Sequence, residues 1–105
     1  MHALVDTKRP AIAAADRRYG VRRLEVVGSA ARETDFDPEH SDIDFLVTFD
    51  TDADLVPLEQ FFGLEDTLAD LLGRPVDLIE AGAVTNPYLK REFEAARELV
   101  FAACG

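Results

Sequence analysis

The pattern of apolar and polar positions predicts three short β-strands. Residues 21–27 are rich in β-branched residues and are followed by a glycine–serine pair that forms a tight turn. Residues 43–49 alternate with period two, so one face of that strand is wholly apolar while the other carries polar side chains. A third, shorter strand is expected over residues 76–79. The apolar face of the second strand consists of Ile43, Phe45, Val47 and Phe49, and the opposite face of Asp42, Asp44, Leu46 and Thr48.

Three segments with helical spacing accompany these strands. Thr7 is expected to cap a helix over residues 8–19, which Gly20 ends. Apolar residues recur every three or four positions over residues 55–72, and a glycine and a proline follow. A last helix is expected over residues 87–103, where the apolar residues again share one stripe. That stripe consists of Leu89, Phe93, Ala96 and Val100.

Strands that alternate with helices predict an α/β fold, with a small mixed sheet of about three strands and flanking helices. The chain of 105 residues contains no internal repeat, low-complexity tract or linker. Its length is close to the commonest domain size and allows one modest hydrophobic core. We therefore expect residues 1–105 to form a single domain.

Charge and composition exclude several classes of function. Twenty-one acidic residues oppose eleven basic ones, and the net charge of −10 argues against direct binding of nucleic acid. The same acidic surface suits a basic partner protein. No apolar stretch is long enough for a bilayer, and charges interrupt the first twenty residues, so neither a membrane span nor a secretory signal is expected. With Cys104 as the only cysteine, no intramolecular disulfide can form, and a cytoplasmic location is predicted.

The acidic residues are concentrated in residues 33–54, which hold nine of them and no lysine or arginine. A solvated acidic loop accounts for most of these side chains, but not for Asp42 and Asp44, which lie in an apolar strand. Two aspartates at positions i and i+2 point the same way, with Cα atoms about 6.5–7 Å apart. Both carboxylates can therefore reach one divalent cation, or bridge two ions about 3.5–4 Å apart. Without a cation, like charges at a half-buried site are costly.

Asp77 is an acid within the apolar third strand. If the second and third strands are neighbours, its carboxylate can join Asp42 and Asp44. Three carboxylates are hard oxygen ligands that select Mg²⁺ or Mn²⁺, with substrate phosphates completing the coordination shell. The alternative is an edge-strand acid that faces water, and Asp77 alone does not decide between the two.

A possible phosphate site follows the first strand. Gly28 allows the backbone to approach a ligand closely, and free N–H groups with the Ser29 hydroxyl can cradle a phosphate if a helix begins there. Arg32 would lie about one turn further on and could hold a phosphate oxygen. The Gly28-Ser29 pair alone is a weak signal, and its order and sequence distance relative to Asp42 and Asp44 strengthen the prediction of a phosphate site.

The run GSAARETDFDPEHSDIDFLVTF resembles the active-site segment of minimal nucleotidyltransferases, within the polymerase-β-like superfamily. The resemblance covers residues 20–105 and implies the nucleotidyltransferase fold in its stand-alone form. It places the catalytic core at about residues 20–80, followed by the C-terminal helix at about 87–103. The later run RPVDLIE resembles the strand that carries the third carboxylate, here Asp77. The residues that match the pattern are Gly28, Ser29, Ala31, Arg32, Ser41, Asp42, Ile43 and Asp44.

Short proteins of this family are similar to antitoxins that are paired with a HEPN-type ribonuclease toxin. The resemblance implies transfer of AMP from ATP to a tyrosine of that toxin, which inactivates it within a hetero-oligomer. Asp42, Asp44 and Asp77 would then bind Mg²⁺ or Mn²⁺ and carry catalysis, and Gly28, Ser29 and Arg32 would bind the nucleotide.

The sequence departs from the family pattern in two ways. Glu33 stands where glycine is usual and puts an anion near the expected triphosphate, and the twelve residues between Ser29 and Asp42 form a longer loop than usual. One alternative is therefore a non-catalytic antitoxin that neutralises its toxin by binding alone. A small-molecule nucleotidyltransferase is another, although 105 residues leave little room for an acceptor pocket.

Overall fold

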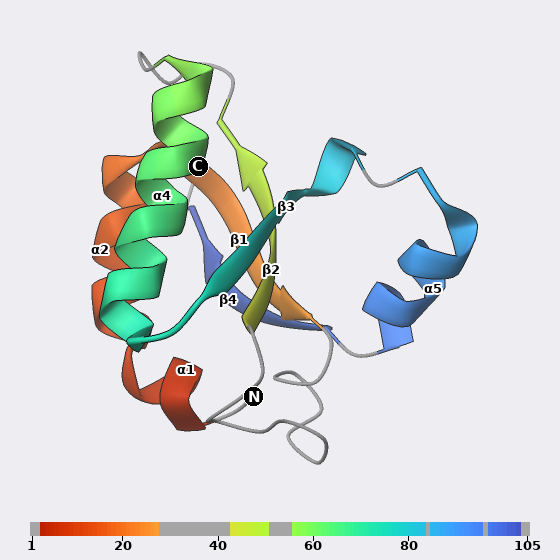
Figure 1. Ribbon diagram of the computed structural model, residues 1–105, viewed down its shortest axis with the longest axis horizontal. Coiled ribbons are helices and arrows are strands. Elements are labelled where there is room, and N and C mark those ends of the chain that lie inside the picture. Colours follow the sequence, from red (N-terminus) through yellow and green to blue (C-terminus); the bar gives the residue numbers. More distant parts are fainter. Residues whose placement is uncertain (1–2, 28–42, 51–55, 84, 96, 104–105) are drawn as a thin grey trace.

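Four strands form one mixed sheet in the order β3-β2-β1-β4 (Figure 1). Strand β1 is antiparallel to both β2 and β4, and β2 is parallel to β3. The predicted mixed α/β architecture is confirmed, with four strands in place of three. The strands are β1 (Val21–Val27), β2 (Ile43–Phe49), β3 (Val76–Glu80) and β4 (Arg97–Ala102).

The computed structural model describes residues 3–27, 43–50, 56–83, 85–95 and 97–103. Helices α2 and α4 cover one face of the sheet, and α5 lies on the other side (Figure 1). Helix α4 connects the parallel strands β2 and β3, which a hairpin turn cannot join. No helix in these ranges has the length and apolar character needed to span a bilayer. The helices are α1 (Ala3–Thr7), α2 (Arg9–Arg18), α4 (Pro57–Leu72), the short 3₁₀ helix η1 (Ala81–Ala83) and α5 (Pro87–Ala95).

The ends of the helices follow from the sequence in part. Gly20 after α2 and Gly73 after α4 have φ of 68° and 65°, the left-handed conformation that favours glycine. Thr7, however, is not the cap of α2. It ends α1, and the N-cap of α2 is Lys8, which makes no side-chain capping hydrogen bond.

The predicted C-terminal helix over residues 87–103 is wrong in its second half. The helix ends at Ala95, and residues Arg97–Ala102 form strand β4 beside β1. Pairing with β1 satisfies backbone groups that the edge of a three-stranded sheet would leave open. It also buries Val100 and Phe101 in the core.

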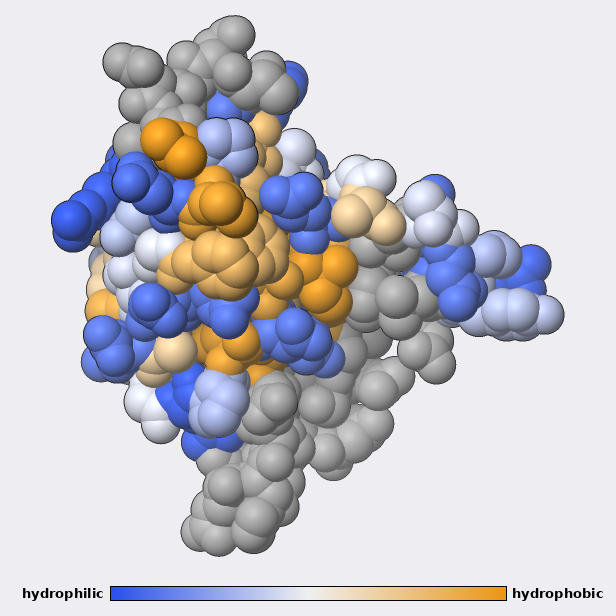
Figure 2. Space-filling view, turned by 45° about the horizontal axis from the view of Figure 1, so that its top comes forward, coloured by the Kyte–Doolittle hydropathy of each residue, from blue (hydrophilic) through white to orange (hydrophobic). Residues whose placement is uncertain are grey.

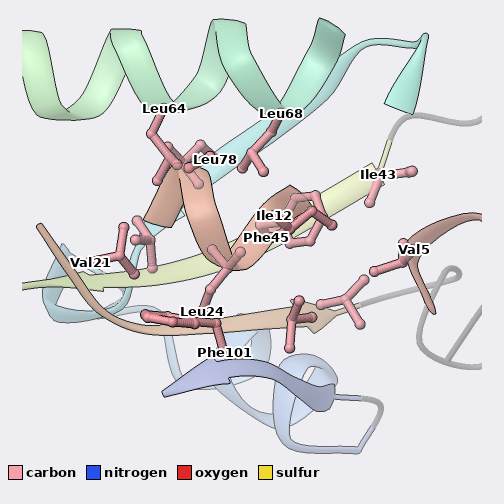
Figure 3. Close-up of a cluster of buried hydrophobic side chains, with 14 of the residues drawn as sticks. Val5, Ile12, Val21, Leu24, Ile43, Phe45, Leu64, Leu68, Leu78 and Phe101 are labelled. Carbon is pink, nitrogen blue, oxygen red and sulfur yellow. The ribbon is translucent and has the colours of Figure 1, made fainter. Parts of the chain in front are cut away.

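The core lies between the sheet and helices α2 and α4 (Figure 3). Alternate residues of β2 point into it, which confirms the predicted apolar face, while Leu46 packs with Val27 on the opposite face. Burial of these side chains fixes the register, because a shift of one residue would turn Asp44 toward the helices. The fully buried core residues include Val5, Ile12, Leu24, Val26, Ile43, Phe45, Val47, Leu64 and Leu68.

One charged group is enclosed with this core. Asp16 of α2 has no exposed surface, and neither of its carboxylate oxygens has a hydrogen-bond partner among the residues that the structure describes. Burial raises the pKa of Asp16 from 3.8 to about 7, an effect that the neighbouring Arg17 partly opposes.

Helix α4 exposes apolar side chains on its outer surface. Leu58 and Phe62 are 68% and 55% exposed and lie one turn apart, so they form one stripe. Three exposed acids spaced seven and four positions apart, Glu59, Asp66 and Asp70, form a row along the same helix, which contains no basic residue. Figure 2 shows apolar side chains in a band over this helix, bordered by hydrophilic ones.

Gly63 is required where α4 meets the end of α2. A Cβ atom at this position would lie 2.5 Å from Cε1 of Tyr19, whose backbone oxygen accepts a hydrogen bond from Gln60. Alanine normally favours a helix over glycine by about 1 kcal/mol. We expect Gly63→Ala to destabilise the protein nonetheless, by about 1–2 kcal/mol in denaturant unfolding, because the tyrosine ring must move. In a Tyr19→Ala background the same change should stabilise, and destabilisation there would show that the ring is not the cause.

Candidate active site

Strand β2 presents its polar residues on the face of the sheet opposite α2 and α4. Ile43 and Phe45 are fully buried beneath the helices, and Asp44 between them points to the other side, where it is half-buried. Leu46 follows Asp44 on this open face and packs against Val27 of β1. An apolar strand therefore holds Asp44 in place.

Asp77 lies beside Asp44. The two residues are direct partners in the parallel register of β2 and β3, so their Cα atoms are separated by about one strand spacing, 4.7–4.9 Å. The predicted adjacency of the second and third strands is thus confirmed. Asp77 is exposed and Asp44 is half-buried, so both side chains are at least partly accessible on this face of the sheet. Two neighbouring anions repel each other, and a divalent cation with its preference for carboxylate oxygen offsets this.

The other predicted site residues, Asp42, Gly28, Ser29 and Arg32, lie outside the described residues. Each is close in sequence to a described strand end. Asp42 immediately precedes β2, and Gly28 immediately follows β1, where Val27 is the partner of Asp44. In the described part of the chain no three acidic, histidine or cysteine side chains come together. That part holds two of the three predicted ligands, and their chemistry fits Mg²⁺ or Mn²⁺.

A cleft of about 260 Å³ adjoins this pair on the same face of the sheet. Leu46 and Ala81 supply apolar lining, and the cleft lies between strands β1, β2 and β4, η1 and α5. Its remaining lining residues are charged: Arg23, Glu25, Lys90, Glu94 and Arg97. The sequence alone did not identify these residues as part of a site.

Glu25 is the buried centre of an ion-pair network in this cleft. Its side chain is only 8% exposed and accepts contacts from Nε of Arg23 at 3.1 Å and from Nε of Arg97 at 2.8 Å. A buried carboxylate needs such charged partners, and here it fixes two guanidinium groups at the edge of the cleft.

Comparison with known proteins identifies the family. A family model described as the nucleotidyltransferase domain matches residues 11–100. The chain belongs to this family. A "Putative protein adenylyltransferase" of Methanocaldococcus jannaschii is 46% identical over 77 residues, which are 73% of this chain and 74% of the relative.

Solved structures agree with the fold of this nucleotidyltransferase. A structure described as a "putative minimal nucleotidyltransferase" superposes with a TM-score of 0.70 at 29% identity, over 93% of this chain and 95% of the other. A second match is to a chain of the structure described as "tri-AMPylated Shewanella oneidensis HEPN toxin in complex with MNT antitoxin". The TM-score is 0.63, over 94% of this chain and 73% of the matched chain. At 18% identity this second match shows the shared fold alone.

The chain is therefore an enzyme of the nucleotidyltransferase class, as its sequence motifs predicted. The paired carboxylates of this nucleotidyltransferase lie on the open face of its sheet.

Proposed function

We propose that the protein is an antitoxin that transfers AMP from ATP to a tyrosine hydroxyl of a HEPN-type ribonuclease toxin and so inactivates it. The single observation that carries this proposal is the register pairing of Asp44 with Asp77 on the open face of a sheet of the nucleotidyltransferase family. The acceptor class is supported by the 46% identical relative, which is named as a protein adenylyltransferase. The choice of toxin is supported by the structural match to an AMPylated HEPN toxin with MNT antitoxin.

In the proposed reaction the acceptor oxygen attacks the α-phosphorus of ATP, and the bond from that phosphorus to the bridging oxygen of pyrophosphate breaks. Asp77 accepts the proton of the acceptor hydroxyl as general base. Asp42 and Asp44, with Asp77, would hold Mg²⁺ or Mn²⁺, which when bound neutralises charge on the phosphates and on the leaving group. Gly28 and Ser29 would hold the β- and γ-phosphates, assisted by Arg32. A reaction that consumes ATP needs a compartment that supplies it, and we propose the cytoplasm.

Position-specific labelling of ATP tests this proposal. The purified protein is incubated with Mg²⁺, the toxin, and ATP labelled at either the α- or the γ-phosphate. Transfer of AMP moves the α label to the toxin and leaves the γ label in pyrophosphate. Transfer of the γ label alone would indicate phosphorylation, and transfer of neither label would reject the enzyme assignment for this acceptor.

The apolar stripe of α4 favours an alternative in which the protein neutralises its toxin by binding it. Such binding would act either alone or in addition to AMP transfer. The exposed side chains of Leu58 and Phe62 offer an apolar contact to a partner, and the acidic row beside them suits a basic one. A second copy of this chain would bring two acidic rows together, which argues for a separate toxin chain and a hetero-oligomer. Because α4 covers the face opposite Asp44 and Asp77, a toxin docked on the stripe would be bound on the side of the sheet away from these carboxylates.

We expect Leu58→Glu to weaken toxin binding at least about tenfold, since it places a charge within an apolar contact. The measurement is the Kd of the complex by calorimetry. Ala14→Glu adds the same charge at an exposed position of α2 and should leave the Kd unchanged. Equal affinity of the Leu58→Glu variant and wild type would show that the stripe is not the docking surface. Neutralisation without ATP that depends on Leu58 would favour the binding-only antitoxin.

A further inference from the structure

The cleft beside the carboxylates is locally basic in an acidic protein. Three basic side chains line it, Arg23, Lys90 and Arg97, against two acidic ones. The chain as a whole carries a net charge of −10. A polyanionic ligand that approaches this face of the sheet therefore meets the basic side chains of the protein in this cleft.

Glu25 holds two of these bases in position without using up their capacity to donate. Arg23 and Arg97 each contact Glu25 through Nε, and a guanidinium carries five N–H donors. The side chains of Arg23 and Arg97 remain 48% and 40% exposed. The two terminal nitrogens of each arginine are the natural donors to a planar or tetrahedral oxyanion.

The sheet order places Arg97 at the far end of a row from Asp77. The register pairs Asp77 with Asp44, Asp44 with Val27, and Val27 with Arg97, so the row crosses β3, β2, β1 and β4 in turn. The Cα atoms of Asp44 and Arg97 are thus two strand spacings apart, about 10 Å. A triphosphate that starts at the carboxylates and extends away from the general base Asp77 runs toward Arg97.

We propose that Arg97, with Arg23 and Lys90, forms a subsite for the polyphosphate chain of the nucleotide and for the pyrophosphate product. The inference rests on the proposed nucleotidyl transfer and adds residues that would hold its leaving group together with Gly28 and Ser29. A triphosphate beside Asp44 and Asp77 needs positive charge beyond that of the metal. Glu25 is a positioning residue that fixes the guanidinium of Arg97.

Calorimetric binding without any toxin present tests this subsite. Mg²⁺–ATP, Mg²⁺–pyrophosphate and adenosine are titrated into wild type, Arg97→Ala and Lys90→Ala. We expect Arg97→Ala to weaken binding of both phosphate ligands by about tenfold to a hundredfold, as for loss of a charge-assisted hydrogen bond, with a smaller loss for Lys90→Ala. Adenosine binding should not change. Arg91→Ala removes the same charge from an exposed position of α5 that does not line the cleft, and is the matched control.

Wild-type affinity for Mg²⁺–ATP in both Arg97→Ala and Lys90→Ala would overturn the inference, as would an equal loss for adenosine. Lys90 is exposed on α5, so its variant tests the subsite even if removal of Arg97 from buried Glu25 unfolds the protein. The binding experiment can fail independently of the proposed function. If ATP binding depends on Arg97 but no AMP is transferred to the toxin, only the acceptor reaction is rejected. If AMP is transferred but ATP binding does not depend on Arg97, only the subsite is rejected.

Discussion

Replacing Asp44 with asparagine should lower the rate of nucleotidyl transfer by about a thousandfold or more. Asparagine keeps the shape of the side chain but removes the charge that would bind the metal, and metal stabilisation of phosphoryl charge contributes several kcal/mol to such reactions. Asp77→Asn should have an effect of similar size, since it removes both a ligand and the proposed base. The measurement is the single-turnover rate of label transfer from α-labelled ATP.

Asp6→Asn is the matched control for this pair. Asp6 is exposed on α1, outside the acidic row of α4 and outside the residues that line the cleft, so the variant removes the same charge at a position that belongs to neither the site nor the proposed docking surface. Its rate should equal that of wild type. If Asp44→Asn transferred AMP within a few-fold of the control, Asp44 would not be a metal ligand, and the pairing of β2 with β3 would have no catalytic meaning.

Asp16 should make the protein less stable as the pH rises toward neutrality. Its pKa is about 7 in the folded chain and 3.8 when burial is absent, so the folded state binds the proton more tightly. Between these two values the unfolded chain releases the proton first, and the free energy of unfolding therefore falls as pH rises. The loss begins near pH 4 and is complete above pH 7. At pH 8 it is of the order of 4 kcal/mol.

The difference in unfolding free energy between Asp16→Asn and wild type isolates this effect from the other carboxylates. Asparagine does not titrate, so the variant should gain about 2 kcal/mol relative to wild type between pH 5.5 and pH 8, measured by urea unfolding. Working above pH 5.5 avoids the range where the net charge approaches zero and the chain associates. Asp70→Asn, at an exposed position of α4, should show no such trend. A pH-independent difference for Asp16→Asn would mean that its carboxyl is solvated in the folded protein.

Strand β2 could be predicted from sequence because every second residue from Ile43 to Phe49 is apolar. Apolar residues at every second position left Asp44 only one face to occupy, and that face is the one observed. The pairing with Asp77 needed one further assumption, that β2 and β3 are neighbours, which the helix between them makes natural. The Asp44–Asp77 part of the site could therefore be predicted from the local sequence pattern together with this one assumption.

Strand β4 could not be predicted in the same way. The register shifts between Leu24 and Glu25 of β1, and as a result Val100 and Phe101, which are adjacent in sequence, are both buried. This irregularity removes the alternation that marks a strand and leaves a spacing that also fits a helix. Only the open edge of β1, a property of the whole sheet, favours the extended conformation.

The cleft and Asp16 depended on tertiary contacts that sequence spacing does not encode. Glu25 and Arg97 belong to strands far apart in the chain, and neither belongs to a recognised motif. Asp16 is the one acid among six bases in residues 8–23, a setting that predicts a solvated ion pair. The helix instead turns its carboxyl toward the interior.

The intact mass of the toxin after reaction tests the central claim most directly. The toxin is incubated with the wild-type protein, ATP and Mg²⁺, and in parallel with the Asp44→Asn variant, and its tyrosine-containing peptides are mapped by mass spectrometry. We expect a toxin heavier by one or more AMP groups on tyrosine, with loss of ribonuclease activity, in the wild-type reaction only. An unmodified toxin that is nonetheless silenced by both proteins would contradict it.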